Sequence, residues 1–241
     1  MRGRARCCGR RFSFRYPFVE LLTGLLFVAC WLQFPPLVAL CGWFFISCLI
    51  AATFIDLDHM IIPDVFTIGL GVFGVLLSVA VPALQGQQEG FFLVDSLRAG
   101  AASLQGLLIG SGLVLWIALL AEMLLRKEAM GFGDVKFVGA IGAFCGWQGA
   151  VFAIFGGAMV GTVWFVGAKL LELAAGRRET IPPPEWIEPE SIDAAEFSSQ
   201  GGLSFGVHVP FGPMLAIAAA LYFLFLRGWV AAWFDQVGTM F

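Results

Sequence analysis

Long apolar runs separated by short polar or basic stretches dominate the pattern of the chain. Most of these runs approach the length of about 20 residues that crosses a bilayer as a helix. Inside lipid, a helix satisfies every backbone polar group within one segment. The pattern therefore predicts an all-α, polytopic transmembrane bundle of about seven membrane helices. The seven segments, placed to within a few residues, are Phe18–Gln33, Leu37–Ile55, Val65–Leu84, Ala99–Leu125, Val135–Trp147, Val151–Leu173 and Phe211–Leu226.

The composition supports a membrane protein and gives no sign of nucleic acid as a partner. Hydrophobic residues make up 59% of the 241 positions and charged residues only 13%, against about 25% charged in ordinary soluble proteins. This excludes a disordered chain and argues against a water-soluble globule. The net charge of −3 gives no reason to expect nucleic-acid binding. Membrane lipids are the expected surroundings.

The basic residues predict the orientation. Counting seven crossings from a cytoplasmic N-terminus, all but two of the 14 Lys and Arg residues, Arg98 and Arg227, fall on the cytoplasmic side, as the positive-inside rule requires. Residues 1–15 are then a basic cytoplasmic tail and residues 16–241 a membrane domain. The Pro-rich, acidic stretch at about 176–208 is expected to be a flexible cytoplasmic loop; docking of a partner is the alternative. The arginines before the first segment are Arg2, Arg4, Arg6, Arg10, Arg11 and Arg15.

Two polar clusters interrupt the apolar pattern. Asp56, Asp58, His59 and Asp64 lie between the second and third segments, and Asp134 follows Gly-Phe-Gly at the start of the fifth. The predicted topology places both clusters at the same membrane face. Two carboxylates held close together share a proton, so one can deprotonate a water while the other donates a hydrogen bond to a peptide carbonyl, as in an aspartic protease.

Each cluster also has a simpler interpretation. An acidic turn between two spans is often solvated, and Asp58, Asp64 or Asp134 could cap a helix. Gly131 and Gly133, without Cβ atoms, would let a substrate backbone approach, although glycines also serve flexible turns. The convergence of the two clusters on one face favours chemistry over two unrelated turns.

At this point the sequence resembles the type IV prepilin peptidases, membrane-embedded aspartic proteases of the GxGD kind. The resemblance rests on four motifs in the family's order, which together cover about residues 15–226. They are Arg15-Tyr16-Pro17-Phe18-Val19-Glu20, the run Ile55-Asp56-Leu57-Asp58-His59 with Ile62-Pro63-Asp64, Met130-Gly131-Phe132-Gly133-Asp134-Val135-Lys136, and Val209-Pro210-Phe211-Gly212-Pro213.

The resemblance implies roles for these residues. The catalytic pair falls on Asp56 and Asp134, while Phe211-Gly212-Pro213 is expected to shape a helix start and His59 to be structural. Lys136 would bias the local charge or anchor the chain at the membrane surface, and Glu20 would hydrogen-bond within the bundle or lie at the surface. The supporting or substrate-positioning set is Asp58, Asp64, Gly131, Gly133, Lys136 and Glu20.

The resemblance also implies a substrate and a place. Prepilins or pseudopilins carry a short basic leader before an apolar helix, and cleavage would occur at the cytoplasmic face of the bacterial inner membrane. The peptidase chemistry needs no metal or cofactor. Many family members also carry an N-terminal domain with two CxxC pairs and N-methylate the product. Here Cys7-Cys8 looks like the tail of that domain, so zinc and S-adenosylmethionine are expected only if a longer N-terminal region exists.

Two other functions compete. A presenilin-like protease is disfavoured because its characteristic motifs are not in the right places. A proton-coupled transporter would be expected to carry acids near the middle of the bilayer, often on broken helices in two matching halves. Here the acids gather at one surface, which favours the peptidase.

Overall fold

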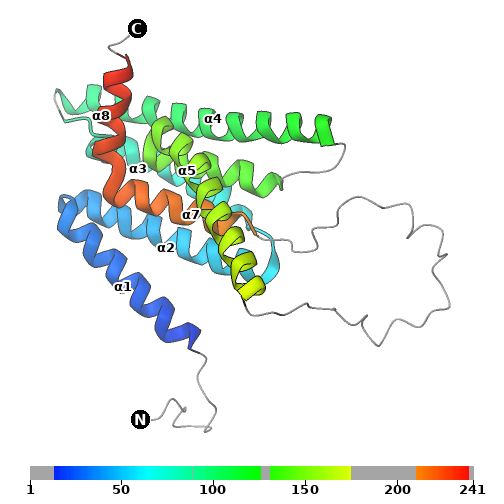
Figure 1. The fold of residues 1–241 in the computed structure, drawn as a ribbon. Coiled ribbons are helices and arrows are strands. Elements are labelled where there is room, and N and C mark those ends of the chain that lie inside the picture. Colours follow the sequence, from blue (N-terminus) through cyan, green and yellow to red (C-terminus); the bar gives the residue numbers. More distant parts are fainter. Residues whose placement is uncertain (1–13, 89, 126–130, 175–209, 239–241) are drawn as a thin grey trace, which may run out of the picture.

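The computed structural model describes residues 14–88, 90–125, 131–174 and 210–238, and every regular element within them is helical (Figure 1). The basic tail, apart from its last residues, and the acidic stretch at 176–208 lie outside the described residues. The elements are α1 (Arg15–Gln33), α2 (Pro36–His59), the π-helical turn η1 (Val65–Gly69), α3 (Leu70–Ala80), the 3₁₀ turn η2 (Pro82–Gln85), α4 (Phe92–Leu125), α5 (Phe132–Ala174), α7 (Gly212–Leu221), the π-helical turn η3 (Tyr222–Leu226) and α8 (Arg227–Gly238).

The helices are those of a membrane protein. In the described part of the chain, five are long and apolar enough to cross a bilayer, and the predicted third segment forms a shorter apolar helix, Val65–Ala80. This confirms the all-α membrane fold, whereas seven crossings and a cytoplasmic N-terminus stay predictions. The five long helices are Arg15–Gln33, Pro36–His59, Phe92–Leu124, Phe132–Leu171 and Gly212–Phe234.

The predicted fifth and sixth segments form one element, α5, which is kinked at Gly146. Its φ of 71° lies in the left-handed region, which glycine adopts without a Cβ clash. The carbonyls of Ala143 and Phe144 lie just before the break and accept hydrogen bonds from side chains of other segments. The Gln85 side-chain amide donates to both, at 3.0 and 3.4 Å, and the Ser103 hydroxyl donates to Ala143 at 2.6 Å. These contacts from η2 and α4 support the kink.

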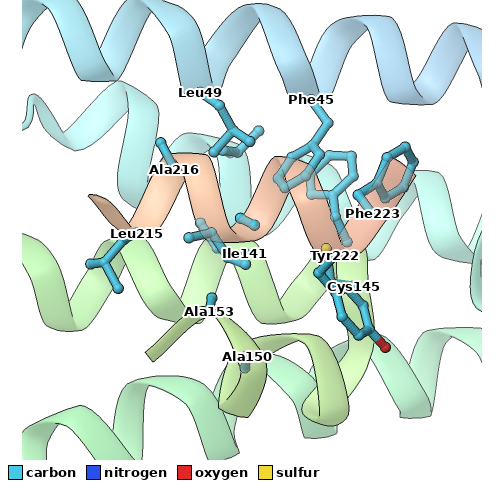
Figure 2. Packing of buried hydrophobic residues seen from close by; sticks show 14 of the residues in the cluster. Phe45, Leu49, Ile141, Cys145, Ala150, Ala153, Leu215, Ala216, Tyr222 and Phe223 are labelled. Carbon is cyan, nitrogen blue, oxygen red and sulfur yellow. The ribbon is translucent and has the colours of Figure 1, made fainter. Parts of the chain in front are cut away.

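The core gathers around α7. Figure 1 shows α7 running between α2 and α5, while α1 pairs with α2 and α4 lies along α5. In Figure 2, Phe45 of α2, Ile141 of α5 and Leu215 of α7 point into one apolar cluster. The Phe45 ring stacks on Phe144 at 4.6 Å between ring centres. Helix α7 is therefore held by neighbours on both sides, which fixes the position of its first residue.

Glycines set the distance between α4 and α5. Gly106 and Gly142 face each other, so a Cβ on either would meet the other's backbone, and a Cβ on Gly110 would lie 2.9 Å from Ala150. Such small residues allow membrane helices to approach closely. Gly106 and Gly110 therefore permit the close approach, whereas Gly112 faces open space.

Another set of glycines packs α5 against α7. A Cβ on Gly161 would lie 2.6 Å from the Met214 sulfur, and Cβ atoms on Gly156 and Gly157 would lie 3.1 Å from α7 side chains. These glycines therefore let α5 and α7 approach closely.

We expect Gly106→Ala to destabilise the protein by about 1–3 kcal/mol, because the added methyl group meets backbone that cannot rotate away. Gly112→Ala, on the same helix, is the matched control. It should be neutral or stabilising by up to about 1 kcal/mol, because alanine is the better helix former. Thermal unfolding of both variants in detergent checks this. Equal stabilities would show that the α4–α5 approach does not depend on Gly106.

Candidate active site

Asp56 lies in the last turn of α2 and faces the start of α7. Its side chain is only 6% exposed, and the backbone amide of Gly212 hydrogen-bonds to it. The first amides of a helix lack partners within the helix, and the helix dipole favours a negative charge there. A Cβ at Gly212 would lie 2.5 Å from Oδ2 of Asp56, so glycine is what permits this approach.

Asp134 reaches the same place from the first turn of α5. It is half-buried, its backbone amide donates to the Gly131 carbonyl at 3.1 Å, and its carboxylate is close enough to Asp56 to interact with it electrostatically. The structure thus brings together two carboxylates that are far apart in the sequence. This is the juxtaposition that the predicted topology required.

Ile62 links the two halves of this site. The chain leaves α2 through Met60, whose φ of 53° places it in the left-handed region, and then turns back. The buried Ile62 therefore reaches both neighbours: its Cδ1 lies 3.0 Å from a Cβ built at Gly212, and its Cβ lies 3.8 Å from one built at Gly133. An apolar side chain thus lies beside the carboxylate pair.

Asp58 is directed away from the pair. Residues two apart on a helix do not share a face, and Asp58 is exposed and bonded to Arg15 of α1. The two guanidinium nitrogens meet the two carboxylate oxygens at 2.8 Å each, and the Arg15 guanidinium also lies over the Phe54 ring. This bidentate ion pair connects α1 to the end of α2.

Asp64 and Lys136 form a second ion pair beside the site, at 2.7 Å. The hydrogen bond and charge of Lys136 hold the pKa of the Asp64 carboxyl below its usual range. Lys136 also lies over the Phe132 ring. The pair joins the turn after α2 to the first turn of α5, so these residues brace the segments that carry Asp56 and Asp134.

Of the remaining predicted residues, Gly131 and Gly133 lie beside the site and Glu20 does not. Cβ atoms built at Gly131 and Gly133 would meet their nearest neighbours at 3.9 and 3.8 Å, which leaves the backbone there open to an approaching chain. Glu20 is exposed on α1 and makes no hydrogen bond or ion pair with the described residues, so it is not brought to the carboxylate pair. His59 is exposed at the end of α2.

Sequence reasoning missed two contributors. Gly212 was expected only to shape a helix start, and Ile62 was given no role. The motif Val209–Pro213 was the available signal for Gly212, but only the packing of α7 against α2 shows that its amide meets Asp56.

In the described ranges, no group of three His, Cys, Asp or Glu side chains could hold a metal ion. Cys7 and Cys8 lie outside the described residues.

Comparison with known proteins matches the sequence of this chain to a family. Residues 43–166 match the type IV leader peptidase family, and residues 1–34 match the bacterial peptidase A24 N-terminal domain. Residues 43–166 contain both Asp56 and Asp134. No solved structure gives a significant match.

Similar proteins carry related names. A "prepilin leader peptidase/N-methyltransferase" of Aeromonas hydrophila is 32% identical over 98% of this chain and 64% of its own length. One of Dickeya chrysanthemi is 36% identical over 61% of this chain and 48% of its own. A "type 4 prepilin-like proteins leader peptide-processing enzyme" of Escherichia coli is 38% identical over 61% of this chain and 50% of its own. This chain thus spans less than two thirds of these relatives. By the match over residues 43–166, which carries both carboxylates, the chain belongs to the type IV leader peptidase family.

Proposed function

We propose that this chain is a membrane-embedded aspartic endopeptidase that removes the short basic leader of prepilin-like proteins. The observation that carries the proposal is the juxtaposition of Asp56 and Asp134, brought from the ends of two helices to one end of the bundle. The names of the relatives, which mention prepilin leader peptidase, support the substrate class.

The two carboxylates would divide the chemistry. Asp56 receives the Gly212 amide hydrogen bond, which favours its ionised form relative to that of Asp134, so Asp56 would take a proton from the attacking water. Asp134 would hold the shared proton and transfer it to the scissile carbonyl oxygen as the water oxygen bonds to the carbonyl carbon. The tetrahedral intermediate then releases the amine, which takes up the proton held by Asp56 as the C–N bond breaks, while Asp134 recovers its proton from a hydroxyl of the intermediate as the new carboxyl group forms.

The surroundings suit a basic leader followed by an apolar helix. Arg15 and Lys136 are each matched by a carboxylate, so Asp56 and Asp134 contribute the excess negative charge near the site. That charge would attract a basic leader. The open backbone at Gly131 and Gly133 would admit the extended substrate chain beside the pair.

We infer that the carboxylate end of the bundle faces the cytoplasm of a bacterial inner membrane. The basic residues support this, because seven crossings leave only Arg98 and Arg227 on the other side. The site also lies at helix ends rather than at mid-helix: Asp56 is in the last turn of α2 and Asp134 in the first turn of α5. That placement supports a peptidase at the membrane surface over a proton-coupled transporter.

We propose cleavage alone. The relatives' names add N-methyltransferase, but Asp56, Asp134 and Gly212 supply only carboxylates and a backbone amide. The proposed cleavage uses water and the carboxylate pair without a cofactor.

We expect Asp56→Asn and Asp134→Asn each to reduce leader cleavage by about 10²–10⁴-fold, because each variant removes one proton-transfer group. Asp58→Asn is the matched control on the same helix turn. Its exposed ion pair is worth at most about 1 kcal/mol, so cleavage should be nearly unchanged. Co-expression with a prepilin at matched membrane levels, followed by gel shift and mass spectrometry, measures this.

If Asp58→Asn loses cleavage and Asp56→Asn retains it, then Asp58 is the catalytic partner of Asp134 and Asp56 is not. Full activity in Asp134→Asn would overturn the pair as the catalytic centre. The mass of the mature product would also show whether a methyl group is added.

We expect Gly133→Ala to fold normally but to cleave at least about tenfold more slowly. Its methyl group makes only an ordinary contact with Ile62, at 3.8 Å, yet it occupies the space that a substrate backbone would approach. Thermal stability and cleavage rate are measured together, with Gly112→Ala as the control. Unchanged cleavage would show that the substrate does not pass beside Gly133.

A further inference from the structure

A second site lies at the other end of the bundle. A cavity of about 570 Å³ is bounded by the α1–α2 turn, η2, the kink of α5 and the junction of η3 with α8. Its lining includes Gln33, Gly146, Tyr222 and Arg227. Helix α2 starts beside this cavity and carries Asp56 in its last turn, so the two sites are roughly 30 Å apart, at about 1.5 Å per helical residue. That separation is close to the thickness of the hydrocarbon core of a bilayer.

Arg227 gives this cavity a positive charge. It is half-buried, a Cβ built at Gly86 would lie 3.9 Å from its Nη2, and its charge acts on the Cys145 thiol and the Tyr222 hydroxyl. No Asp or Glu is among the described residues that line the cavity. Among the described residues, no carboxylate forms an ion pair with Arg227. A partly buried cation without a counter-ion favours binding of an anion.

Side-chain amides add hydrogen-bond donors around that charge. Gln33, Gln87 and Gln148 line the cavity, and each carboxamide can donate two hydrogen bonds. Gln85 also lines it but is committed to the carbonyls at the kink. A guanidinium surrounded by neutral donors, with no carboxylate nearby, matches the oxygens of a phosphate group.

The neighbouring surface is apolar. Phe225 lines the cavity and is 58% exposed, and Trp229, one helical turn after it, is 68% exposed. In a chain that spans a membrane, such exposed side chains face lipid, and tryptophan favours the interfacial level. An occupant with a phosphate head and acyl chains would satisfy both the cation and this apolar flank. We propose that this cavity binds the phosphate headgroup of an anionic phospholipid, with Arg227 as its main ligand.

Binding there would connect three elements that border the cavity. Arg227 begins α8, while Gln148 follows the Gly146 kink and Gln87 follows η2. One headgroup that contacts all three would hold the end of α8 against the kink. The lipid would therefore stabilise the end of the bundle opposite the carboxylate pair.

The test uses the full chain purified in detergent. Dissociation constants are measured for short-chain phosphatidylglycerol, short-chain phosphatidylcholine and inorganic phosphate, with the unmodified protein, Arg227→Gln, Arg227→Lys and Arg98→Gln. Arg98 is the control because it is an exposed arginine on α4 outside the cavity. Phosphatidylglycerol should bind more tightly than the other two probes. Arg227→Gln should weaken it about tenfold or more, through loss of a charge-assisted contact, and Arg227→Lys by less, because lysine keeps the charge.

Equal weakening in Arg98→Gln, or no weakening in Arg227→Gln, would overturn the proposal. Equally tight, Arg227-dependent binding of inorganic phosphate would support an anion site but overturn its assignment to lipid. Should Arg227→Gln fail to fold, Gln148→Leu removes a donor while keeping the volume, and it should weaken phosphatidylglycerol by several-fold. The unmodified protein provides an independent check: phosphatidylglycerol should raise its unfolding temperature more than phosphatidylcholine does, and equal effects would contradict the proposal.

Discussion

Backbone polar groups at helix ends and breaks need partners from outside the helix, and this constraint shapes both ends of the bundle. At one end, the unpartnered amide at the start of α7 is met by Asp56. At the other, the carbonyls beside the Gly146 kink accept hydrogen bonds from Gln85 and Ser103. In each case, a helix irregularity requires a polar side chain from another segment. The polar residues of this apolar chain are therefore concentrated where helices begin, end or break.

The site depends on this requirement as much as on the carboxylates themselves. Helix α7 can present Gly212 to Asp56 because it is packed between α2 and α5 through side chains such as Phe45 and Leu215 (Figure 2). The glycines of α5 that face α7 allow that packing to be close. A change in the apolar core would thus move the amide that Asp56 requires, although the core residues lie far from the proposed chemistry.

The parts of this arrangement that hydropathy controls could be predicted from the sequence, and the parts that tertiary contacts control could not. Apolar runs located the helices, and the two acidic clusters were expected at one face because the topology required it. The kink was not anticipated, since Gly146 is one of 30 glycines and only its φ distinguishes it. The pairing of Asp58 with Arg15 likewise depends on how α1 packs against α2. In the sequence, Ile62 looks like any apolar loop residue. Only the turn at Met60 brings it beside the carboxylate pair.

The two ends also differ in how their charges are balanced, and this difference bears on function. Among the described residues near the carboxylate pair, the cations Arg15 and Lys136 already have carboxylate partners, so Asp56 and Asp134 are left without a cation there. At the opposite cavity, Arg227 has no carboxylate partner within the described lining, so the uncompensated charge is positive. A polypeptide with a basic leader is complementary to the first end, and an anionic headgroup to the second. Each proposed occupant thus follows from a charge that the described part of the fold leaves unpaired.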